Sequence, residues 1–115
     1  MRILVCGGRD YADAESVRIV LRELQPSMVI HGAYRGADTL AEEWARANGV
    51  PTRPYPADWS RGPKAGPERN AQMLREGMPN LVVAFPGGNG TADMVMRARA
   101  AGVEVVEVVG ATSRA

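Results

Sequence analysis

Apolar residues gather in five short runs along the chain, four of them rich in Val, Ile or Leu. Runs of this length and composition are typical of strands that are buried on both faces of a sheet. The third run lies among prolines, which indicates a short strand at a sheet edge. The predicted strands are residues 2–6, 28–31, 52–55, 81–85 and 103–109.

Apolar residues recur at intervals of three and four positions between these runs, which predicts a helix in each segment. Asp13 is the expected N-cap of the first helix, and Gly102 is expected to stop the last. The predicted helices extend from Asp13 to Leu24, from Asp38 or Thr39 to Asn48, from Pro67 to Arg75 and from Thr91 to Ala101.

Strands that alternate with helices in this way form a parallel sheet with helices on both faces, because right-handed crossovers place them there. The prediction is a single α/β domain over residues 1–110, followed by a frayed tail at 111–115.

Glycine-rich turns follow three of the predicted strands, at residues 7–8, 32–36 and 87–90. The carboxyl ends of parallel strands share one edge of the sheet, so we expect these turns to lie at the same edge. Ligands of open α/β sheets bind at that edge, where the strand order reverses. The pattern therefore predicts a ligand site built from these turns.

The turn at residues 86–91, Pro-Gly-Gly-Asn-Gly-Thr, carries the most specific chemical signal. Its glycines let the backbone approach a ligand closely, and the following helix start offers unpaired N–H groups and a positive dipole end to an anion. It is either a phosphate site or a tight turn that binds nothing, and the second glycine turn, Gly7-Gly8, favours the phosphate site. No lysine precedes Thr91 as in a P-loop, and Gly7-Gly8 lacks the dinucleotide pattern Gly-x-Gly-x-x-Gly.

Composition narrows the classes of function. The formal charge of +1 over 115 residues gives no overall basic field for nucleic acid. Lys64 is the one lysine among 14 basic residues, so 13 are arginines, whose forked donors suit phosphate and carboxylate. The sequence lacks a signal-peptide pattern and any apolar run near the ~20 residues that span a bilayer, which predicts a cytoplasmic protein. With one cysteine and one histidine, neither a metal nor a cofactor is predicted.

Arg9, Arg35 and Arg69 fall in or beside loops at the predicted ligand edge. An isolated loop arginine is usually only solvated, whereas three that converge would hold a phosphate through paired hydrogen bonds. Asp10 and Asp38 either order these arginines or hold a ribose.

Other side chains each have an ordinary explanation beside a functional one. Tyr11 and Trp59 lie in loops, where an aromatic ring either stacks on a base or packs on its own core. His31 ends a strand, and a lone histidine there is more often a structural hydrogen-bonder than a catalyst. Asn70 is expected to contact a base or a sugar, and Cys6 is interpreted as a small core residue rather than a nucleophile.

Several motifs, taken in order, resemble the SLOG superfamily, in particular its YspA-like group related to the cpYpsA proteins. They extend over nearly the whole chain and are specific together, although each alone is weak. The matching pieces are Gly7-Gly8-Arg9-Asp10-Tyr11, His31-Gly32-Ala33, Arg35-Gly36-Ala37-Asp38-Thr39-Leu40-Ala41, Tyr55-Pro56-Ala57-Asp58-Trp59, Ala65-Gly66-Pro67 with Arg69-Asn70 and Met73, and Ala84-Phe85-Pro86-Gly87-Gly88-Asn89-Gly90-Thr91-Ala92-Asp93.

The resemblance implies a Rossmann-like sheet in strand order 3-2-1-4-5 and a homo-oligomeric assembly. The superfamily includes Lonely Guy phosphoribohydrolases, which cleave the N-glycosidic bond of a nucleoside monophosphate, and DNA-processing protein A, which binds single-stranded DNA. Lonely Guy enzymes carry Pro-Gly-Gly-x-Gly-Thr-x-x-Glu, and Met94 stands at the position of that glutamate. Asp93 is the nearby acid, but one residue turns a helical side chain by ~100°.

The sequence therefore predicts a domain that binds a nucleotide or nucleotide-sugar ligand as a sensor or carrier. One alternative is N-glycosidic cleavage with Asp93 or Asp10 as acid or base. Another is binding of single-stranded DNA, which the near-neutral charge argues against. The expected ligand-binding residues are Gly7, Gly8, Arg9, Asp10, Tyr11, His31, Gly32, Arg35, Gly36, Asp38, Thr39, Asp58, Trp59, Arg69, Asn70, Pro86, Gly87, Gly88, Asn89, Gly90 and Thr91.

Overall fold

The computed structural model describes residues 1–109, in which five strands form one parallel sheet. The sheet order is β3-β2-β1-β4-β5, which confirms the α/β class and the strand order that the resemblance implies. The strands are β1 (Arg2–Cys6), β2 (Met28–His31), β3 (Thr52–Pro54), β4 (Leu81–Ala84) and β5 (Glu104–Glu107). The predicted tail at 111–115 lies outside the described residues.

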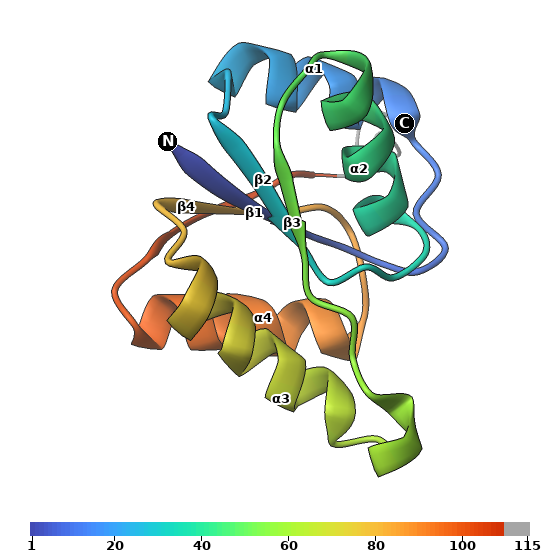
Figure 1. Cartoon of the computed structure of the whole chain (residues 1–115), viewed down its shortest axis with the longest axis vertical. Coiled ribbons are helices and arrows are strands. Elements are labelled where there is room, and N and C mark those ends of the chain that lie inside the picture. Colours follow the sequence, from blue (N-terminus) through green and yellow to red (C-terminus); the bar gives the residue numbers. More distant parts are fainter. Residues whose placement is uncertain (110–115) are drawn as a thin grey trace.

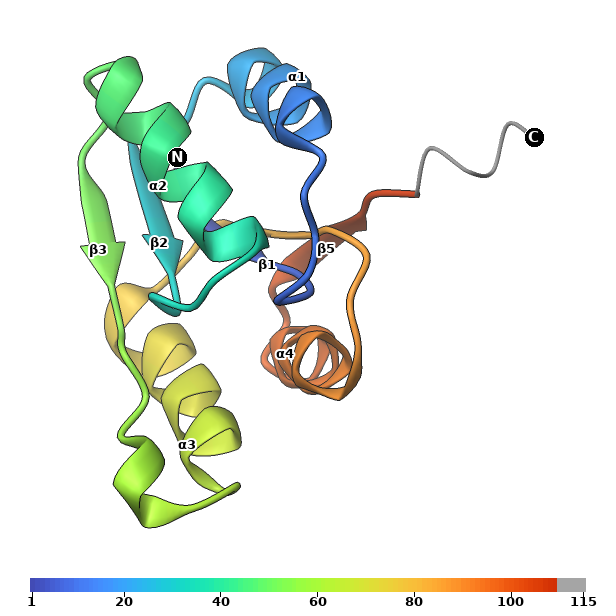
Figure 2. The same cartoon turned by 90° about the vertical axis from the view of Figure 1, so that its right-hand side faces the viewer.

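Helices cover both faces of the sheet. Helices α1 (Ala14–Leu24) and α2 (Ala37–Ala47) lie on one face, and α3 (Ala65–Gln72) and α4 (Asn89–Ala100) lie on the other (Figure 1; Figure 2). A 3-10 turn, η1 (Trp59–Arg61), precedes α3, and a π-helical turn, η2 (Met73–Gly77), continues it. None of the helices in the described part of the chain combines the length and the apolar character needed to cross a membrane.

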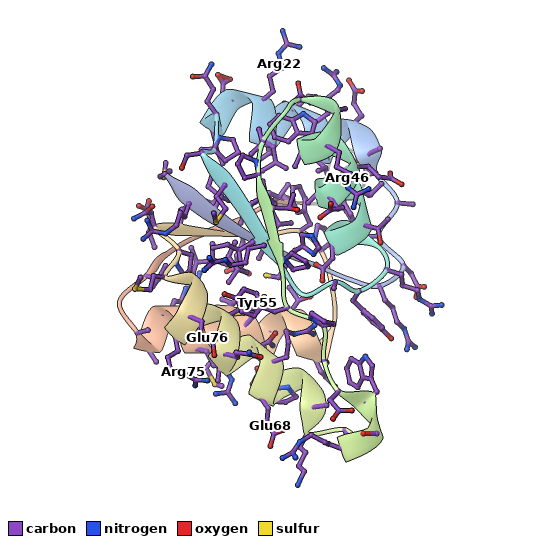
Figure 3. The ribbon with its side chains drawn as sticks, in the orientation of Figure 1. Arg22, Arg46, Tyr55, Glu68, Arg75 and Glu76 are labelled. Carbon is purple, nitrogen blue, oxygen red and sulfur yellow. The ribbon has the colours of Figure 1, made fainter. Side chains whose placement is uncertain are left out.

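Alternate residues of the central strand face the two helical layers. Ile3 and Val5 pack in the cluster under α1 and α2, whereas Leu4 and Cys6 pack in the cluster under α3 and α4. Tyr55 belongs to the second cluster, and Figure 3 shows it between the sheet and α3, while the labelled charged side chains of the helices extend outward. Burial on both faces explains why the central strands read as continuous apolar runs.

Several boundaries differ from the prediction. α4 begins at Asn89 rather than Thr91, because the Gly88 carbonyl already accepts the Ala92 N–H at 3.0 Å. β4 ends at Ala84, β5 covers only Glu104–Glu107, and α3 begins at Ala65, ahead of Pro67. The glycine turn after β4 is therefore shorter than expected, and its second half forms the first turn of α4.

The two helices on the other face begin differently. Asp13 caps α1 as predicted, since its Oδ1 accepts the Ser16 N–H at 3.0 Å. α2 begins at Ala37 after Gly36, without a side-chain cap. Asp38, expected at the helix start, lies one residue inside the helix and its carboxylate binds the preceding turn instead.

Candidate ligand-binding site

A cavity of about 870 Å³ opens at the carboxyl edge of the sheet, where β1 and β4 end. β1 pairs with β2 on one side and β4 on the other, so the strand order reverses at this point. Cavities of about 300–1,000 Å³ are typical of small-molecule sites, and open α/β sheets bind their ligands at this reversal. The turns after β1 and β4, the first part of α3, Tyr34 and Trp59 all contribute to the lining.

One side of the cavity, the glycine wall, consists of Gly7, Gly8, Gly87 and Gly88. The Gly8 N–H donates to the Pro86 carbonyl at 2.9 Å, which joins the two turns. A Cβ on Gly87 would lie 2.6 Å from the Gly8 nitrogen, so only glycine permits this approach. A Cβ on Gly88 would meet no atom within 4 Å, so its missing side chain leaves space beside the backbone instead.

The start of α4 adds unpaired donors to this wall. The N-cap Gly88 provides no side-chain cap, and no hydrogen bond within the described residues reaches the N–H groups of Asn89, Gly90 and Thr91. All three residues line the cavity. Such N–H groups, together with the positive end of the helix dipole, favour an anion.

The polar floor of the cavity consists of Asp38, Arg69, Asn70 and Asp93. Asn70 is 4% exposed, and its Nδ2 donates to the Gly90 carbonyl at 3.2 Å and to Asp93 Oδ2 at 3.0 Å. Arg97 Nε donates to the same Asp93 oxygen at 2.8 Å. Asn70 therefore ties α3 to the first turn of α4, the turn that carries the free N–H groups.

Arg69 is held in place by backbone oxygens. Its Nη1 donates to the Gly32 carbonyl, and its Nε donates to Asn70 Oδ1 at 3.1 Å. A Cβ on Gly32 would lie 2.6 Å from Arg69 Cζ, so glycine at this position makes room for the guanidinium. Burial lowers the pKa of Arg69, and the charge of Asp38 opposes that shift.

Asp38 fixes the turn after β2 from the other side. Its Oδ2 accepts the Gly32 N–H at 3.1 Å and the Tyr34 N–H at 3.3 Å. Burial raises the pKa of Asp38 above its ordinary value, against the charges of His31 and Arg69 and the two N–H bonds. Desolvation thus outweighs the favourable contacts of this carboxylate.

Cys6 lies at the end of β1 and also reaches the cavity lining. Burial, with a smaller contribution from Asp38, raises the pKa of its thiol to about 12. The thiol is therefore uncharged at neutral pH, which agrees with a core residue and not with a nucleophile.

An aromatic pair, Tyr34 and Trp59, also contributes to the lining. Their ring centroids are 5.6 Å apart and their planes are tilted by 45°. Tyr34 is 36% exposed and Trp59 is 49% exposed. Two large aromatic side chains therefore remain open to solvent beside the cavity, in positions that do not belong to the core.

Comparison with known proteins identifies the family of the chain. A sequence profile described as the YspA, cpYpsA-related SLOG family matches residues 1–62. The chain belongs to this SLOG family. It is also similar to a protein of Mycobacterium phage D29 named Gene 61 protein, with 38% identity in an alignment 118 positions long, which covers 91% of this chain and 94% of the phage protein.

Most of the residues predicted from the SLOG resemblance and the loop pattern come together at the cavity. Those in its lining are Gly7, Gly8, Arg9, Asp10, Tyr11, Asp38, Trp59, Arg69, Asn70, Asp93 and the six residues of the 86–91 turn. Those outside it are His31, Gly32, Arg35, Gly36, Thr39 and Asp58.

The predicted residues outside the lining have structural partners. His31 Nε2 lies 2.6 Å from Glu42 Oε1, and its Nδ1 accepts the Ala33 N–H at 2.9 Å. Gly36 has φ +83°, and a Cβ there would meet the carbonyl oxygen of Gly8. His31 and Gly36 therefore stabilise the turns after β2 and β1 rather than line the cavity.

Each of the remaining predicted residues outside the lining either contacts a lining residue or precedes one in the chain. Asp58 caps η1 by accepting the Ser60 N–H at 3.2 Å, and Thr39 Oγ1 donates to the Tyr34 carbonyl at 3.0 Å. Arg35 lies 3.8 Å from Asp10 in an exposed ion pair.

Sequence reasoning missed several residues of the lining. Four of them could have been found from the SLOG resemblance, because Gly66, Pro67 and Met73 belong to a matched piece and Tyr34 lies between two others. The others are Val5, Cys6 and Pro63. Val5 and Cys6 carry no sequence signal beyond that of core residues.

Of positions 93 and 94 on α4, Asp93 and not Met94 contributes to the cavity. Met94 is fully buried in the cluster under α3 and α4, whereas Asp93 lines the cavity. Asn70 and Arg97 both bind Oδ2 of Asp93, and within the described residues no hydrogen bond reaches its Oδ1. One carboxylate oxygen thus remains free.

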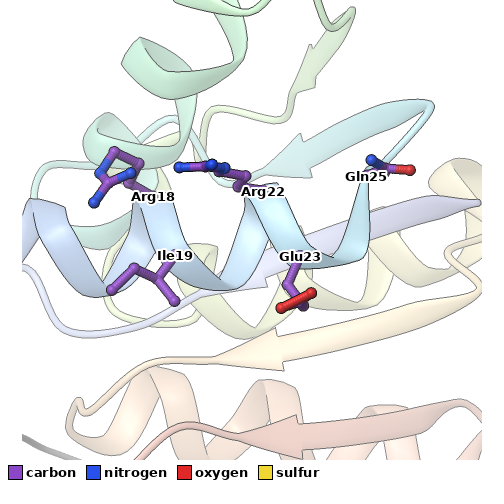
Figure 4. Close-up of a pocket in the computed structure, with 5 residues that line it drawn as sticks. All are labelled: Arg18, Ile19, Arg22, Glu23 and Gln25. Carbon is purple, nitrogen blue, oxygen red and sulfur yellow. The ribbon is translucent and has the colours of Figure 1, made fainter.

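Two further hollows lack these features. One of about 410 Å³ lies on the outer surface of α1, among exposed charged side chains (Figure 4). The other, of about 460 Å³, lies between α4 and β5 on the opposite side of the glycine turn. Neither combines backbone donors with buried polar groups, so we assign no function to either.

Proposed function

We propose that this SLOG protein binds a nucleotide or nucleotide-sugar-derived ligand in the 870 Å³ cavity, as a sensor or carrier. The observation that carries the proposal is the uncapped start of α4, whose three free N–H groups open beside the glycine wall. A phosphate placed there would accept from these N–H groups and gain from the helix dipole. Membership of the SLOG family supports a ligand of this kind.

Charged side chains support the same placement. Arg9 follows the glycine wall in the lining, and Arg69 is already held by backbone oxygens. A guanidinium fixed before binding loses little entropy when it pairs with an anion. The polar floor then offers hydrogen-bonding groups to the sugar, next to the phosphate position.

The test is thermal melting against nucleotides, cyclic dinucleotides and ADP-ribose derivatives, followed by mass spectrometry of each mixture. A ligand at 100 times its dissociation constant adds about 2.7 kcal/mol to the free energy of unfolding. We expect a shift with the ligand recovered intact.

Gly88→Val tests the position of the phosphate. The new side chain would occupy the space beside the α4 N–H groups, so the melting shift is expected to disappear. Ala92→Val is the matched control, because Ala92 lies in the same helical turn but outside the cavity lining. A shift that survives Gly88→Val would place the ligand elsewhere.

N-glycosidic cleavage of a nucleoside monophosphate is the second candidate, and the free Oδ1 of Asp93 in the cavity favours it. Asp93 would stabilise the cationic sugar or activate the water that replaces the base, while the base leaves with a proton. Free base and ribose phosphate should then appear on incubation, and Asp93→Asn should abolish them. Products that still form with Asp93→Asn would exclude Asp93.

A further inference from the structure

We infer that Trp59 is a stacking platform for a flat heteroaromatic ring of the ligand, and that Gly66 sets the position of its indole. This inference rests on the proposed function, and it specifies the end of the ligand that the phosphate site does not contact. A protein with such a platform should bind nucleotides, which have a base, more tightly than sugar phosphates, which lack one.

The segment that carries Trp59 is fixed at several points. Asp58 Oδ1 accepts from the Ser60 N–H at 3.2 Å and from the Ser60 hydroxyl at 2.5 Å. The Trp59 carbonyl accepts the Gly62 N–H at 3.0 Å. Arg61 Nε lies 3.0 Å from Glu68 Oε1, which ties η1 to α3. The indole is thus carried by an anchored turn.

Gly66 brings the indole close to the backbone of α3. A Cβ on Gly66 would lie 3.3 Å from Trp59 Cη2 and 3.7 Å from Cζ3. Glycine inside a helix is less stable than alanine, so a glycine in the first turn of α3 calls for a local reason. Gly66 also precedes Pro67, and glycine there avoids the clash of a Cβ with the proline ring. The contact with Trp59 is a second reason, since alanine would push the ring outward by a few tenths of an ångström.

Tyr34 holds the indole from another side, at the 5.6 Å centroid separation given above. Tyr34 itself is positioned by Asp38, which binds its N–H, and by Thr39, which binds its carbonyl. Despite these supports Trp59 remains 49% exposed, and it lines the cavity. An indole that is fixed, exposed and next to a ligand cavity is preorganised for stacking.

Trp59 lies against Gly66 in the first turn of α3, and Asn70 lies one turn further along the same helix. Asn70 Nδ2 reaches the Gly90 carbonyl at the start of α4. The lining therefore extends from an aromatic surface through hydrogen-bonding groups to the proposed anion site. A nucleotide has these three parts in the same order. Stacking of a base on an aromatic side chain changes affinity by about five-fold to a hundred-fold and tolerates different bases.

The first experiment compares adenosine 5′-monophosphate and cytidine 5′-monophosphate with ribose 5-phosphate, which lacks the base. It uses the Trp44→Phe protein, in which Trp59 is the remaining tryptophan of the two in the chain. Trp44 lies on α2, outside the cavity lining. We expect the monophosphates to quench Trp59 fluorescence and ribose 5-phosphate to bind without quenching.

Two variants complete the test by calorimetry. Trp59→Leu should weaken the monophosphates at least five-fold and leave ribose 5-phosphate unchanged. Gly66→Ala should weaken the monophosphates by a smaller factor and leave the affinity for ribose 5-phosphate unchanged. A parallel loss of folding would be visible in the melting temperature of each variant.

The remaining outcomes separate the two proposals. Equal binding of all three probes, unchanged by Trp59→Leu, would overturn the stacking role while the phosphate site stands. Absence of binding by all three probes would overturn this inference, and the proposed function would fall with it only if the melting panel of nucleotides, cyclic dinucleotides and ADP-ribose derivatives also gave no shift. Oligo(dT) is titrated in the same way. If oligo(dT) quenches Trp59 and none of the three probes binds, a single-stranded DNA surface would replace both proposals.

Discussion

The glycine wall and the polar floor of the same cavity are built in opposite ways. The wall is backbone from two turns that each follow a strand, and Gly8 and Gly87 almost touch within it. The floor is made of side chains that reach across the fold, as Asn70 reaches Asp93. Substitutions in the wall should therefore act through steric conflict, and those in the floor through lost hydrogen bonds.

Gly87→Ala should give the largest effect. The new Cβ would approach the Gly8 nitrogen to 2.6 Å and also meet Thr91 Oγ1. Thr91 can rotate away, but the backbone of Gly8 cannot move without disturbing its bond to Pro86. We expect a loss of about 3 kcal/mol in the free energy of unfolding, at the upper end for overpacking.

Urea unfolding of Gly87→Ala and Gly88→Ala would measure this contrast. A Cβ on Gly88 meets nothing within 4 Å, so only the weaker N-cap preference of alanine remains, which costs less than about 1 kcal/mol. Equal losses in the two variants would mean that the close approach of the two turns does not stabilise the fold.

Asn70→Ala tests the polar floor. Its Nδ2 bonds to the Gly90 carbonyl and to Asp93 would be lost at a site that is 4% exposed. Leaving buried partners unpaired costs about 2 kcal/mol. Asn48→Ala is the control, because Asn48 Nδ2 also donates to a carbonyl, that of Trp44 at 2.8 Å, but at an exposed position.

Water can replace the amide of Asn48, so Asn48→Ala should lower the free energy of unfolding by less than about 0.5 kcal/mol. Urea unfolding of the two variants measures the difference. Similar losses at both asparagines would show that burial of the Asn70 amide adds nothing.

Asp38→Asn should change how stability depends on pH. Burial raises the pKa of Asp38 above 3.8, so the folded protein holds this proton more tightly than the unfolded chain. The free energy of unfolding contributed by Asp38 therefore falls as pH rises through the window above 3.8, by at most about 1.4 kcal/mol per pH unit.

Both N–H bonds of Asp38 go to Oδ2, so an asparagine oxygen can accept them without titrating. Urea unfolding at several pH values between about 4 and about 7 compares the two proteins. The bond from His31 lowers the pKa of Glu42, which has the opposite effect, but this group is present in both proteins and cancels. The free energy of unfolding of the parent protein minus that of Asp38→Asn should fall as pH rises through this window. A value that stays constant or rises with pH would contradict the prediction.

The two sides of the cavity also differ in how well the sequence predicts them. The wall is local: glycines directly after strands fall at the shared edge once the strands are parallel, and the switch between β1 and β4 places the turns face to face. Gly7, Gly8 and Gly87 could therefore be predicted without coordinates.

The floor depends on side chains that meet across long stretches of chain. Nothing in the sequence says that Arg69 binds the Gly32 carbonyl or that Asp38 binds the turn before it. Gly32 and Gly36 were expected to contact the ligand as glycines of a turn, whereas the structure shows that they leave room for Arg69 and for the Gly8 carbonyl. The side chains of Asp93 and Met94 leave α4 in different directions, so that Asp93 lines the cavity and Met94 packs in the core.

Arg35 gives the smallest expected change in stability. It forms an exposed ion pair with Asp10 at 3.8 Å, with side-chain exposures of 66% and 85%. Such pairs contribute less than about 0.5 kcal/mol, so Arg35→Ala should unfold almost as the parent protein does.

Arg75→Ala is the matched control, since Arg75 also pairs at the surface, 3.6 Å from Glu76, but away from the cavity. If Arg35 assists an anionic ligand, Arg35→Ala should weaken its binding, more at low salt than at high salt, while Arg75→Ala leaves it unchanged. Equal affinity of the two variants would restrict the charged part of the site to Arg9, the polar floor and the start of α4.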